Sequence, residues 1–234
     1  MPIEYPSKSR VNKAGRRIRQ SLRLESLTSD MTWREDVEIV RAHRQPMVTA
    51  NVSVRKYCSR QGLPASITQR LKRLDTILDK LGREPTLQLG NMQDIGGVRV
   101  VLHSVDDIWT MLDWLRRNHP DAQVSDYVTQ PRSSGYRAVH VVAQWGSDPR
   151  KPVEIQLRSK VMHNWADMVE EASALLGINY KHDRESEFNT WALATSRIME
   201  AQEFGKPVTP EMYRALRQAS DNLFQTQSHS TGGE

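Results

Sequence analysis

Apolar positions along the chain divide it into a helical part, a part with strands and a second helical part. In residues 66–81 an apolar residue recurs every three or four positions, which predicts a single amphipathic helix that ends at Gly82. The members of this apolar stripe are Ile67, Leu71, Leu74, Leu78 and Leu81.

Two helices are expected before this one. In residues 7–24 apolar and basic positions recur at helical spacing, which predicts a short amphipathic helix. A second helical stretch runs from Trp33 to beyond Val54, and Pro46 is expected to kink or divide it. Gly62 marks the break that follows.

Short β-branched runs after residue 94 predict strands, separated by helical patterns. Strands are expected at 95–102, 124–129, 138–145 and 153–157, with a helix at 105–118. Three more helices are expected: the first begins at Lys160, the second covers 188–204 and the third covers 210–224. The pattern therefore predicts an α/β (α+β) fold with four strands around one crossover helix.

The length of the chain predicts one catalytic domain with appendages, because a chain of 234 residues can bury one sizeable core. We expect a basic N-terminal helical extension at 1–62, a core at 63–178, C-terminal helices at 179–225 and a disordered tail at 226–234. The tail is expected to be disordered because its residues are small and polar.

Composition restricts the class of protein. The single cysteine, Cys58, cannot form an internal disulfide and has neither metal-ligand spacing nor a redox partner. No apolar run approaches the ~20 residues needed to span a bilayer, and the N-terminal segment lacks the apolar stretch of a secretory signal. We therefore expect a soluble cytoplasmic protein that does not bind a membrane.

Positive charge is concentrated near the N-terminus. Lys and Arg exceed Asp and Glu by 33 to 28 overall. Within residues 1–23, Glu4 stands alone against Lys8, Arg10, Lys13, Arg16, Arg17, Arg19 and Arg23. Such a block attracts polyanions through counterion release, although a solvated helix face or a frayed basic tail would have the same composition.

Cations and a hydroxyl share one stripe of the helix expected at 66–81. Lys72, Thr76 and Lys80 fall at i, i+4 and i+8, whereas Arg70 diverges from Lys72 by about half a turn. This stripe suits a triphosphate. Taken alone, a solvated basic face is the more ordinary explanation of the stripe.

The segment QDIGGVRVV places an acidic residue at the start of a buried strand. Asp94 is costly there unless it is paired or binds a metal, and Gly96 and Gly97 leave space for a ligand or another chain segment. Mg²⁺ usually takes one or two carboxylates, so Asp94 is a candidate ligand. Arg99 offers a grip on phosphate or a surface that stacks on a base, and a structural Asp–Arg pair is the alternative.

A turn-rich segment, PRSSG, precedes Tyr136 and His140, which are four residues apart and are expected on one face of a strand. With Arg132 they offer a platform for base stacking and hydrogen bonds that place an acceptor. Core packing of the Tyr/His pair is the alternative.

Polar and apolar residues alternate in VEIQLRS, so Glu154, Gln156 and Arg158 are expected on one face of a strand. Glu154 either completes a magnesium site with Asp94 or accepts the proton of an attacking hydroxyl. An ordinary half-exposed strand would show the same alternation.

Together these motifs resemble the synthetase domain of the RelA/SpoT nucleotide pyrophosphokinases. RxK…T…K in QRLKRLDTILDK, DIGGVR, DYxxxPxxxGYRAVH and VEIQLR occur in that family's order and spacing, over about residues 66–174. The resemblance implies a nucleotidyltransferase-like domain, a mixed sheet of about four to five strands flanked by helices, with helical extensions at both ends. It also implies transfer of a diphosphate from ATP to a ribose 3′-hydroxyl.

The resemblance further implies roles for individual residues. It implies that Asp94 and Glu154 are catalytic and hold Mg²⁺, and that Glu154 activates the 3′-oxygen. ATP would be held by Arg70, Lys72, Thr76, Lys80 and Arg99. The acceptor would be placed by Tyr136, His140, Gln156 and Arg132.

The acceptor itself is open. Ser134 stands where alarmone-making relatives often carry Asn, and the leader SKSRVNKAGRRIR resembles that of toxic small alarmone synthetases. Members of that group have protein antitoxins, and some pyrophosphorylate the 3′ end of tRNA. We therefore favour tRNA as the acceptor, for a growth-inhibiting toxin that blocks translation, with Lys8, Arg10, Lys13, Arg16 and Arg17 binding the tRNA. The alternatives are synthesis of guanosine or adenosine alarmones from ATP, and an inactive RNA-binding module.

Overall fold

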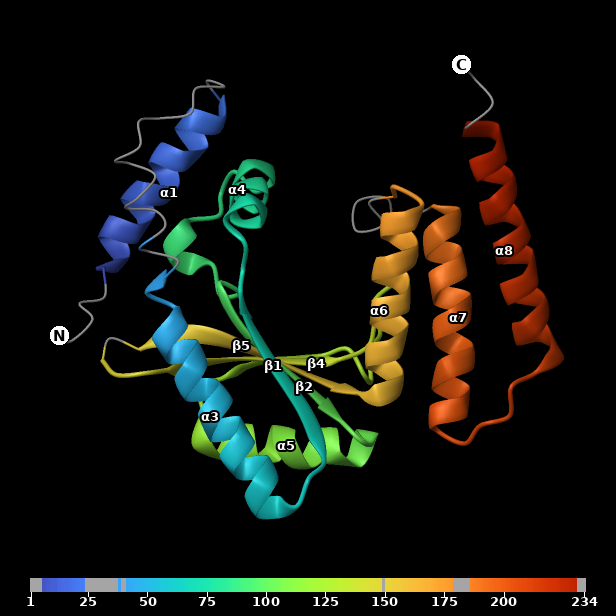
Figure 1. The fold of residues 1–234 in the computed structure, drawn as a ribbon, viewed down its shortest axis with the longest axis horizontal. Coiled ribbons are helices and arrows are strands. Elements are labelled where there is room, and N and C mark those ends of the chain that lie inside the picture. The colour runs from blue at the N-terminus through green and yellow to red at the C-terminus, as the bar shows by residue number, and fades with distance from the viewer. Residues whose placement is uncertain (1–5, 24–37, 39–40, 149, 179–185, 231–234) are drawn as a thin grey trace. The chain divides into compact units, whose positions relative to one another are not determined.

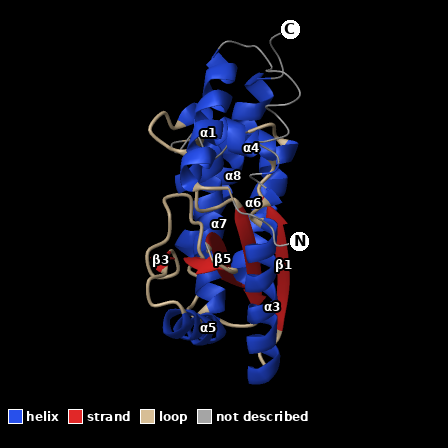
Figure 2. Ribbon diagram, turned by 90° about the vertical axis from the view of Figure 1, so that its left-hand side faces the viewer, coloured by secondary structure: helices blue, strands red, loops and turns tan. Residues whose placement is uncertain are grey.

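The computed structural model describes residues 6–23, 38, 41–148, 150–178 and 186–230. Its sheet has five strands in the order β1–β2–β5–β4–β3, so β1 and β3 form the two edges (Figure 2). The strands are β1 (Ala65–Leu71), β2 (Gly96–Leu102), β3 (Gln123–Asp126), β4 (Val139–Trp145) and β5 (Lys151–Ser159). The expected mixed sheet of about four to five strands flanked by helices is confirmed.

The helices carry the labels of Figure 1. They are α1 (Lys8–Arg23), α3 (Arg44–Gln61), α4 (Leu74–Arg83), the 3₁₀ turn η1 (Leu89–Asn91), α5 (Val105–Asn118), α6 (Lys160–Leu175), α7 (Glu187–Glu203) and α8 (Pro210–Ser230). The helices expected at 105–118, 188–204 and 210–224 are confirmed, as is the one after Lys160. In the described part of the chain, no helix has the length and apolar character needed to cross a membrane.

The C-terminal tail differs from our expectation. Helix α8 continues to Ser230, so residues 226–230 are helical, although the whole of 226–234 was expected to be disordered. Residues 231–234 lie outside the described residues. The domain boundaries expected after residues 62 and 178 stay a prediction.

The single helix expected over residues 66–81 is wrong. Residues 65–71 form the edge strand β1, and α4 begins only at Leu74. Pairing with distant residues keeps the chain extended, because the backbone N–H of Lys72 donates to the carbonyl of Ile95 at 2.8 Å. The apolar spacing misled because a strand followed by a helix reproduces it. Ile67 is buried from the strand, whereas Ile77 and Leu81 are buried from the helix.

The chain before β1 is divided, but not at Pro46. Turn residues 42–43 precede α3, and Pro46 lies in its first turn, where a missing N–H costs little. The helix ends at Gly62, whose φ of 65° lies in the left-handed region that favours glycine. Trp33, where the stretch was expected to begin, lies outside the described residues.

The chain forms two compact units. The first comprises Met1–Val100, Trp109–Val124 and His140–Gln156, and the second comprises Val101–Ile108, Ser125–Val139 and Leu157–Glu234.

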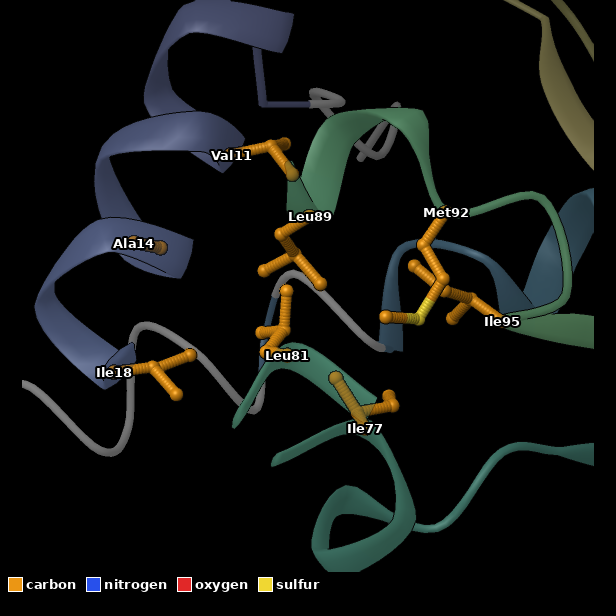
Figure 3. Packing of buried hydrophobic residues seen from close by; sticks show 8 residues of the cluster. All are labelled: Val11, Ala14, Ile18, Ile77, Leu81, Leu89, Met92 and Ile95. Carbon is orange, nitrogen blue, oxygen red and sulfur yellow. The ribbon is translucent and has the colours of Figure 1, made fainter. Parts of the chain in front are cut away.

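In the first unit, α1 packs against α4 and the η1 segment through a small apolar cluster (Figure 3). Its buried members are Val11, Ala14, Ile18, Ile77, Leu81, Leu89, Met92 and Ile95. In the same unit, the rings of Tyr57 from α3 and Trp114 from α5 are stacked with their centroids 4.5 Å apart. The cluster fixes the segment that leads from α4 to β2.

In the second unit, helices α6, α7 and α8 lie side by side (Figure 1). Their shared core contains Trp165, Ala166, Val169, Phe188, Ala192 and Leu223. Helix α6 begins after Ser159, whose hydroxyl accepts the N–H of Met162 at 3.1 Å, and Ser186 caps α7 in the same way.

Candidate active site

A cluster of opposite charges in the first unit surrounds Asp94, which lies just before β2. The Nζ of Lys72 lies 2.7 Å from Oδ2 of Asp94, and the Nζ of Lys80 lies 3.2 Å from the same oxygen. The three side chains are between 19% and 28% exposed. Lys72 precedes α4 and Lys80 lies within it, so the two lysines meet through the strand–helix turn and not through a common helical stripe.

The carboxylate of Asp94 is ionised at neutral pH. Burial by itself raises its pKa, but the hydrogen bond and charge of Lys72, together with Lys80, hold the pKa below its ordinary value of 3.8. Its other oxygen, Oδ1, is buried and accepts no hydrogen bond from the described residues. An unsatisfied buried carboxylate oxygen is costly unless a cation or water reaches it.

A second carboxylate of the first unit, Glu154 on β5, is held by hydrogen bonds at both oxygens. The Nδ1 of His140, on the neighbouring strand β4, lies 2.8 Å from Oε1, and Gln156 donates to Oε2 at 2.8 Å. Glu154 and Gln156 lie on one face of β5, because the residues that alternate with them are buried. The expected alternation is therefore confirmed at Glu154 and Gln156, whereas Arg158, which was expected on the same half-exposed face, is buried.

The charge state of Glu154 follows from these contacts. Burial by itself raises the pKa of Glu154, but His140 above all, and Gln156, outweigh it, so that the pKa lies below its ordinary value of 4.5. The negative charge of Asp94 acts in the opposite direction and raises it. The two carboxylates therefore share one electrostatic environment.

The pair fits the needs of Mg²⁺. This ion takes one or two protein carboxylates and completes its octahedron with water and phosphate oxygens. Asp94 offers an oxygen without a hydrogen-bond partner among the described residues, and Glu154 is ionised. No group of three or more His, Cys, Asp or Glu side chains in the described part of the chain could hold a metal alone. A metal here would need oxygens from a bound phosphate or from water.

The glycines of DIGGVR serve the chain itself. A Cβ on Gly96 would lie 3.4 Å from Cβ of Met47 and 3.5 Å from the carbonyl of His43, both at the start of α3. One on Gly97 would be in ordinary contact with neighbouring strands. Of the two expected reasons for these glycines, the close approach of another chain segment is the one that Gly96 displays.

The remaining candidates for ATP binding are more exposed. Arg70 lies on β1 and Thr76 in the first turn of α4, both exposed, whereas Arg99 on β2 is half-buried. The hydroxyl of Thr76 lies 3.4 Å from the carboxylate of Asp75. The structure thus joins Lys72 and Lys80 to Asp94, and leaves Arg70 and Thr76 at the surface.

In the second unit, residues 127–138 form a loop between β3 and β4, which we name the Tyr136 loop. The hydroxyl of Tyr136 accepts a hydrogen bond from Arg158 at 3.1 Å, and its ring lies 6.1 Å from that of Tyr127. The guanidinium of Arg132 lies 4.4 Å from the Tyr127 ring centroid and 5.6 Å from that of Tyr136. Tyr136 is half-buried and also packs against the core of α6 and α7.

The chain around Tyr136 differs from the expected strand, because β4 begins only after it. Tyr136 precedes β4, which begins at Val139, so the expected placement of Tyr136 and His140 on one strand face is wrong. Hydrogen bonds within the loop, such as Arg132 N–H to the Tyr136 carbonyl at 3.1 Å, replace strand pairing there. Arg158 was given no role, although its alternation with Leu157 placed it on the same strand face as Glu154.

The basic helix α1 presents two kinds of cation. Lys8, Arg10, Lys13 and Arg16 are exposed, and Arg17 is half-buried. Arg19 instead donates to the carbonyls of Leu81, Glu84 and Leu87. The exposed cations form the outer face of a helix whose inner face is docked in the apolar cluster.

Part of the sequence matches a known family and known proteins. Residues 69–185 match the family described as a region found in RelA / SpoT proteins. The GTP pyrophosphokinase YjbM of Bacillus subtilis (strain 168) is 31% identical over 125 residues, which are 50% of this chain and 56% of that protein. The chain thus spans about half the length of the curated relatives it matches.

Solved structures share the fold. A GTP pyrophosphokinase family protein from Streptococcus pneumoniae has a TM-score of 0.60 at 24% identity, over 85% of this chain and 98% of that one. The small alarmone synthetase 1 from Bacillus subtilis, bound to its product pppGpp, has a TM-score of 0.59 at 24% identity, over 75% and 95% respectively.

Proposed function

The chain belongs to the RelA/SpoT family, and on this premise we propose that it is a pyrophosphokinase that transfers the β,γ-diphosphate of ATP to the 3′-hydroxyl of a guanosine nucleotide. The observation that carries the proposal is the pair of ionised carboxylates, Asp94 and Glu154, in one environment with two lysines. The guanosine acceptor is supported by the relatives, one named for GTP and one bound to pppGpp.

The donor side needs positive charge more than covalent chemistry. In phosphoryl transfer a protein mainly positions the reactants in line and neutralises the charge that spreads over the phosphate oxygens. Lys72 and Lys80, which pair with Asp94, would bind the phosphates of ATP. Arg70, Thr76 and Arg99 complete the proposed donor set, in line with the motif that carries them.

Asp94 and Glu154 would hold Mg²⁺, which would supply positive charge against the charge that develops on the phosphates of ATP. The oxygen of Asp94 that accepts no hydrogen bond from the described residues supports this assignment.

Glu154 would also orient the attacking hydroxyl. Its lowered pKa keeps it ionised at neutral pH, which makes it a good hydrogen-bond acceptor and a weak proton acceptor. His140 and Gln156 fix the direction of the carboxylate through its two oxygens. For Glu154, positioning the 3′-oxygen and binding the metal are therefore better supported roles than complete removal of the proton from the 3′-hydroxyl.

The base of the acceptor would stack near Tyr136. Arg158 holds the tyrosine hydroxyl, and Arg132 supplies a guanidinium beside the two tyrosine rings. Planar side chains of this kind stack on bases, and guanidinium groups bind phosphate.

The 3′ end of tRNA is the second candidate acceptor, and the exposed cations of α1 favour it. Lys8, Arg10, Lys13 and Arg16 face solvent in the unit that carries Asp94 and Glu154. A mononucleotide does not need such a face, whereas an RNA backbone binds it through counterion release. The growth-inhibiting role and the protein antitoxin belong to this second candidate.

The test is to incubate the purified protein with γ-labelled ATP and Mg²⁺, offering GDP, GTP, ATP and deacylated tRNA in separate reactions. We expect label on GDP or GTP and a fall of at least about a hundredfold in Glu154→Gln. The matched control, Glu171→Gln, changes an exposed glutamate of α6 and should transfer at the wild-type rate.

The outcomes separate the candidates. Label on tRNA alone would replace the guanosine acceptor by the second candidate. A labelled adenosine nucleotide with a new diphosphate on its 3′-oxygen would indicate an adenosine alarmone. Absence of transfer to any of the four acceptors would refute the enzymatic proposal and leave an RNA-binding module.

A further inference from the structure

The residues on both sides of Tyr136 are fastened to helix α7. Gly135 precedes the tyrosine and contacts Ser196, and Arg137 follows it and contacts Glu203. All of these residues belong to the second unit. Tyr136 is thus held between two anchored neighbours.

At Gly135 the loop backbone lies directly against the helix. The hydroxyl of Ser196 donates to the Gly135 carbonyl at 2.6 Å, in a buried hydrogen bond. A Cβ on Gly135 would lie only 2.6 Å from Cβ of Ser196 and 3.2 Å from Cα of Leu193. The φ of 86° at Gly135 also belongs to the left-handed region that favours glycine. Both the conformation and the close approach therefore require glycine.

At Arg137 the anchor is a buried ion pair. Its Nη1 lies 3.3 Å from Oε2 of Glu203, and the two side chains are 4% and 8% exposed. The guanidinium also lies 5.1 Å from the ring centroid of Phe204, but Nε and Nη2 have no hydrogen-bond partner among the described residues. Burying a pair with incomplete hydrogen bonding gives little net stability, so stability alone is a poor reason for its presence.

The anchors lie on one side of α7. Ser196 and Glu203 are seven residues apart, which is two helical turns. One turn before Ser196, the carbonyl of Ala192 accepts a hydrogen bond from Nε1 of Trp165 at 3.0 Å. The Trp165 ring lies 6.3 Å from that of Tyr136. One face of α7 therefore supports the Tyr136 ring through the backbone on either side and through Trp165.

We propose that Ser196 and Glu203 are positioning residues for the acceptor, which they affect by fixing the orientation of Tyr136. The inference rests on the proposed function, in which Tyr136 stacks on the acceptor base. Helix α7 begins at Glu187, beyond the matched family region that ends at residue 185. The acceptor site would therefore depend on a helix outside that region.

The first test replaces Ser196 by alanine, which removes one hydrogen bond and little volume. The matched control is Thr195→Ala, since the Thr195 hydroxyl donates at 2.9 Å to the Trp191 carbonyl of its own helix. Steady-state kinetics would give KM for the guanosine nucleotide and for ATP. Amide hydrogen exchange of residues 132–138 would report the loop without requiring turnover.

In Ser196→Ala we expect the acceptor KM to rise about fivefold, the effect of one hydrogen bond of ordinary strength, while the KM for ATP stays unchanged. Exchange in the Tyr136 loop should become faster. Thr195→Ala should change neither quantity. Equal KM increases for both substrates, or the same effects in Thr195→Ala, would mean a merely structural role and overturn the inference.

A second variant, Glu203→Gln, tests the other anchor without changing its shape. We expect the same selective rise in acceptor KM and faster exchange around Arg137. If this variant does not fold, Ser196→Ala decides the question. If the wild type transfers no diphosphate, the proposed function fails, and unchanged loop exchange in Ser196→Ala would then overturn the anchor as well.

Discussion

Lys72 and Lys80 both donate to one carboxylate oxygen of Asp94, although they precede it by 22 and 14 residues. The sequence pattern placed the two lysines on one helical stripe for ATP and Asp94 at the start of a strand for Mg²⁺, and these roles stay predictions. The two ammonium groups instead converge because the chain turns from β1 into α4 between them.

The lowered pKa of Asp94 predicts a dependence of stability on pH. A carboxyl whose pKa is lower in the folded state stabilises the fold fully above its unfolded pKa, near its ordinary value of 3.8. The stabilisation is lost as pH falls through the lower, folded value. We expect Asp94→Asn to lose less free energy of unfolding than the wild type between about pH 5 and pH 2, measured by urea denaturation.

The control for this prediction is Asp113→Asn, which changes an exposed aspartate of α5. Its curve of unfolding free energy against pH should parallel that of the wild type. An Asp94→Asn curve with the same acid slope as the wild type would contradict the role of the two lysines.

At the scale of elements, α1 is joined to the donor side of the site by more than its apolar stripe. The guanidinium of Arg19 donates to carbonyls at and beyond the C-terminal end of α4, including that of Leu81 at 3.1 Å. These contacts satisfy carbonyls that a helix end leaves without partners, and the positive charge suits the negative end of the helix dipole. Lys80 lies next to this end of α4.

Replacing Arg19 by alanine should therefore lower the free energy of unfolding by about 1.5 to 3 kcal/mol, the range for hydrogen bonds to charged groups. Arg16→Ala removes an exposed arginine from the same helix and should change it by less than about 0.5 kcal/mol. Urea denaturation at neutral pH would measure the free energy of unfolding of both variants. Equal effects would show that Arg19 contributes no more than a surface cation.

Elements with purely local patterns were predictable. The helices α5, α6 and α7 have amphipathic periods of sufficient length, and β5 alternates polar and buried residues. The strand β1 could not be predicted in this way, because its extended form depends on pairing with a segment more than twenty residues later. Its apolar positions alone match a helix.

The candidate site was likewise predictable where the pattern is local and not where distant residues meet. Spacing along one strand placed Glu154 and Gln156 together, and a motif connected them to Asp94. The anchors of the Tyr136 loop could not be predicted, because Arg137 and Glu203 are 66 residues apart. Arg137 lies in the motif GYRAVH, but Glu203 lies in no motif that the sequence shows. The signal at Gly135 was visible as a glycine in a turn, but not its contact with α7.

Charge is distributed unevenly over the whole chain, which has a net charge of +5. Neutralising Arg10, Lys13 and Arg16 together with glutamine should weaken tRNA binding and reduce the slope of log K against log salt by about 1 per cation that contacts a phosphate. Fluorescence anisotropy with labelled tRNA at several salt concentrations measures this slope. The control neutralises three exposed arginines elsewhere: Arg60, Arg116 and Arg117.

If the α1 triple variant and the control triple lower the slope equally, the cations of α1 have no special part in binding RNA. If only the α1 variant lowers it, this helix is a polyanion-binding face. The result applies to RNA binding alone and is independent of which acceptor receives diphosphate.

The docking of α1 has a consequence for how the chain is made. Asn12 donates to Gln88 and accepts the N–H of Gly90, which is 78 residues later. At about 5 to 20 residues per second, a ribosome needs roughly 4 to 16 seconds to synthesise these 78 residues. Throughout this interval the apolar side chains of α1 lack the residues of α4 and η1 that cover them in the folded protein. A slower translation of the residues between α1 and η1 therefore lengthens the time for which this apolar stripe has no partner in its own chain.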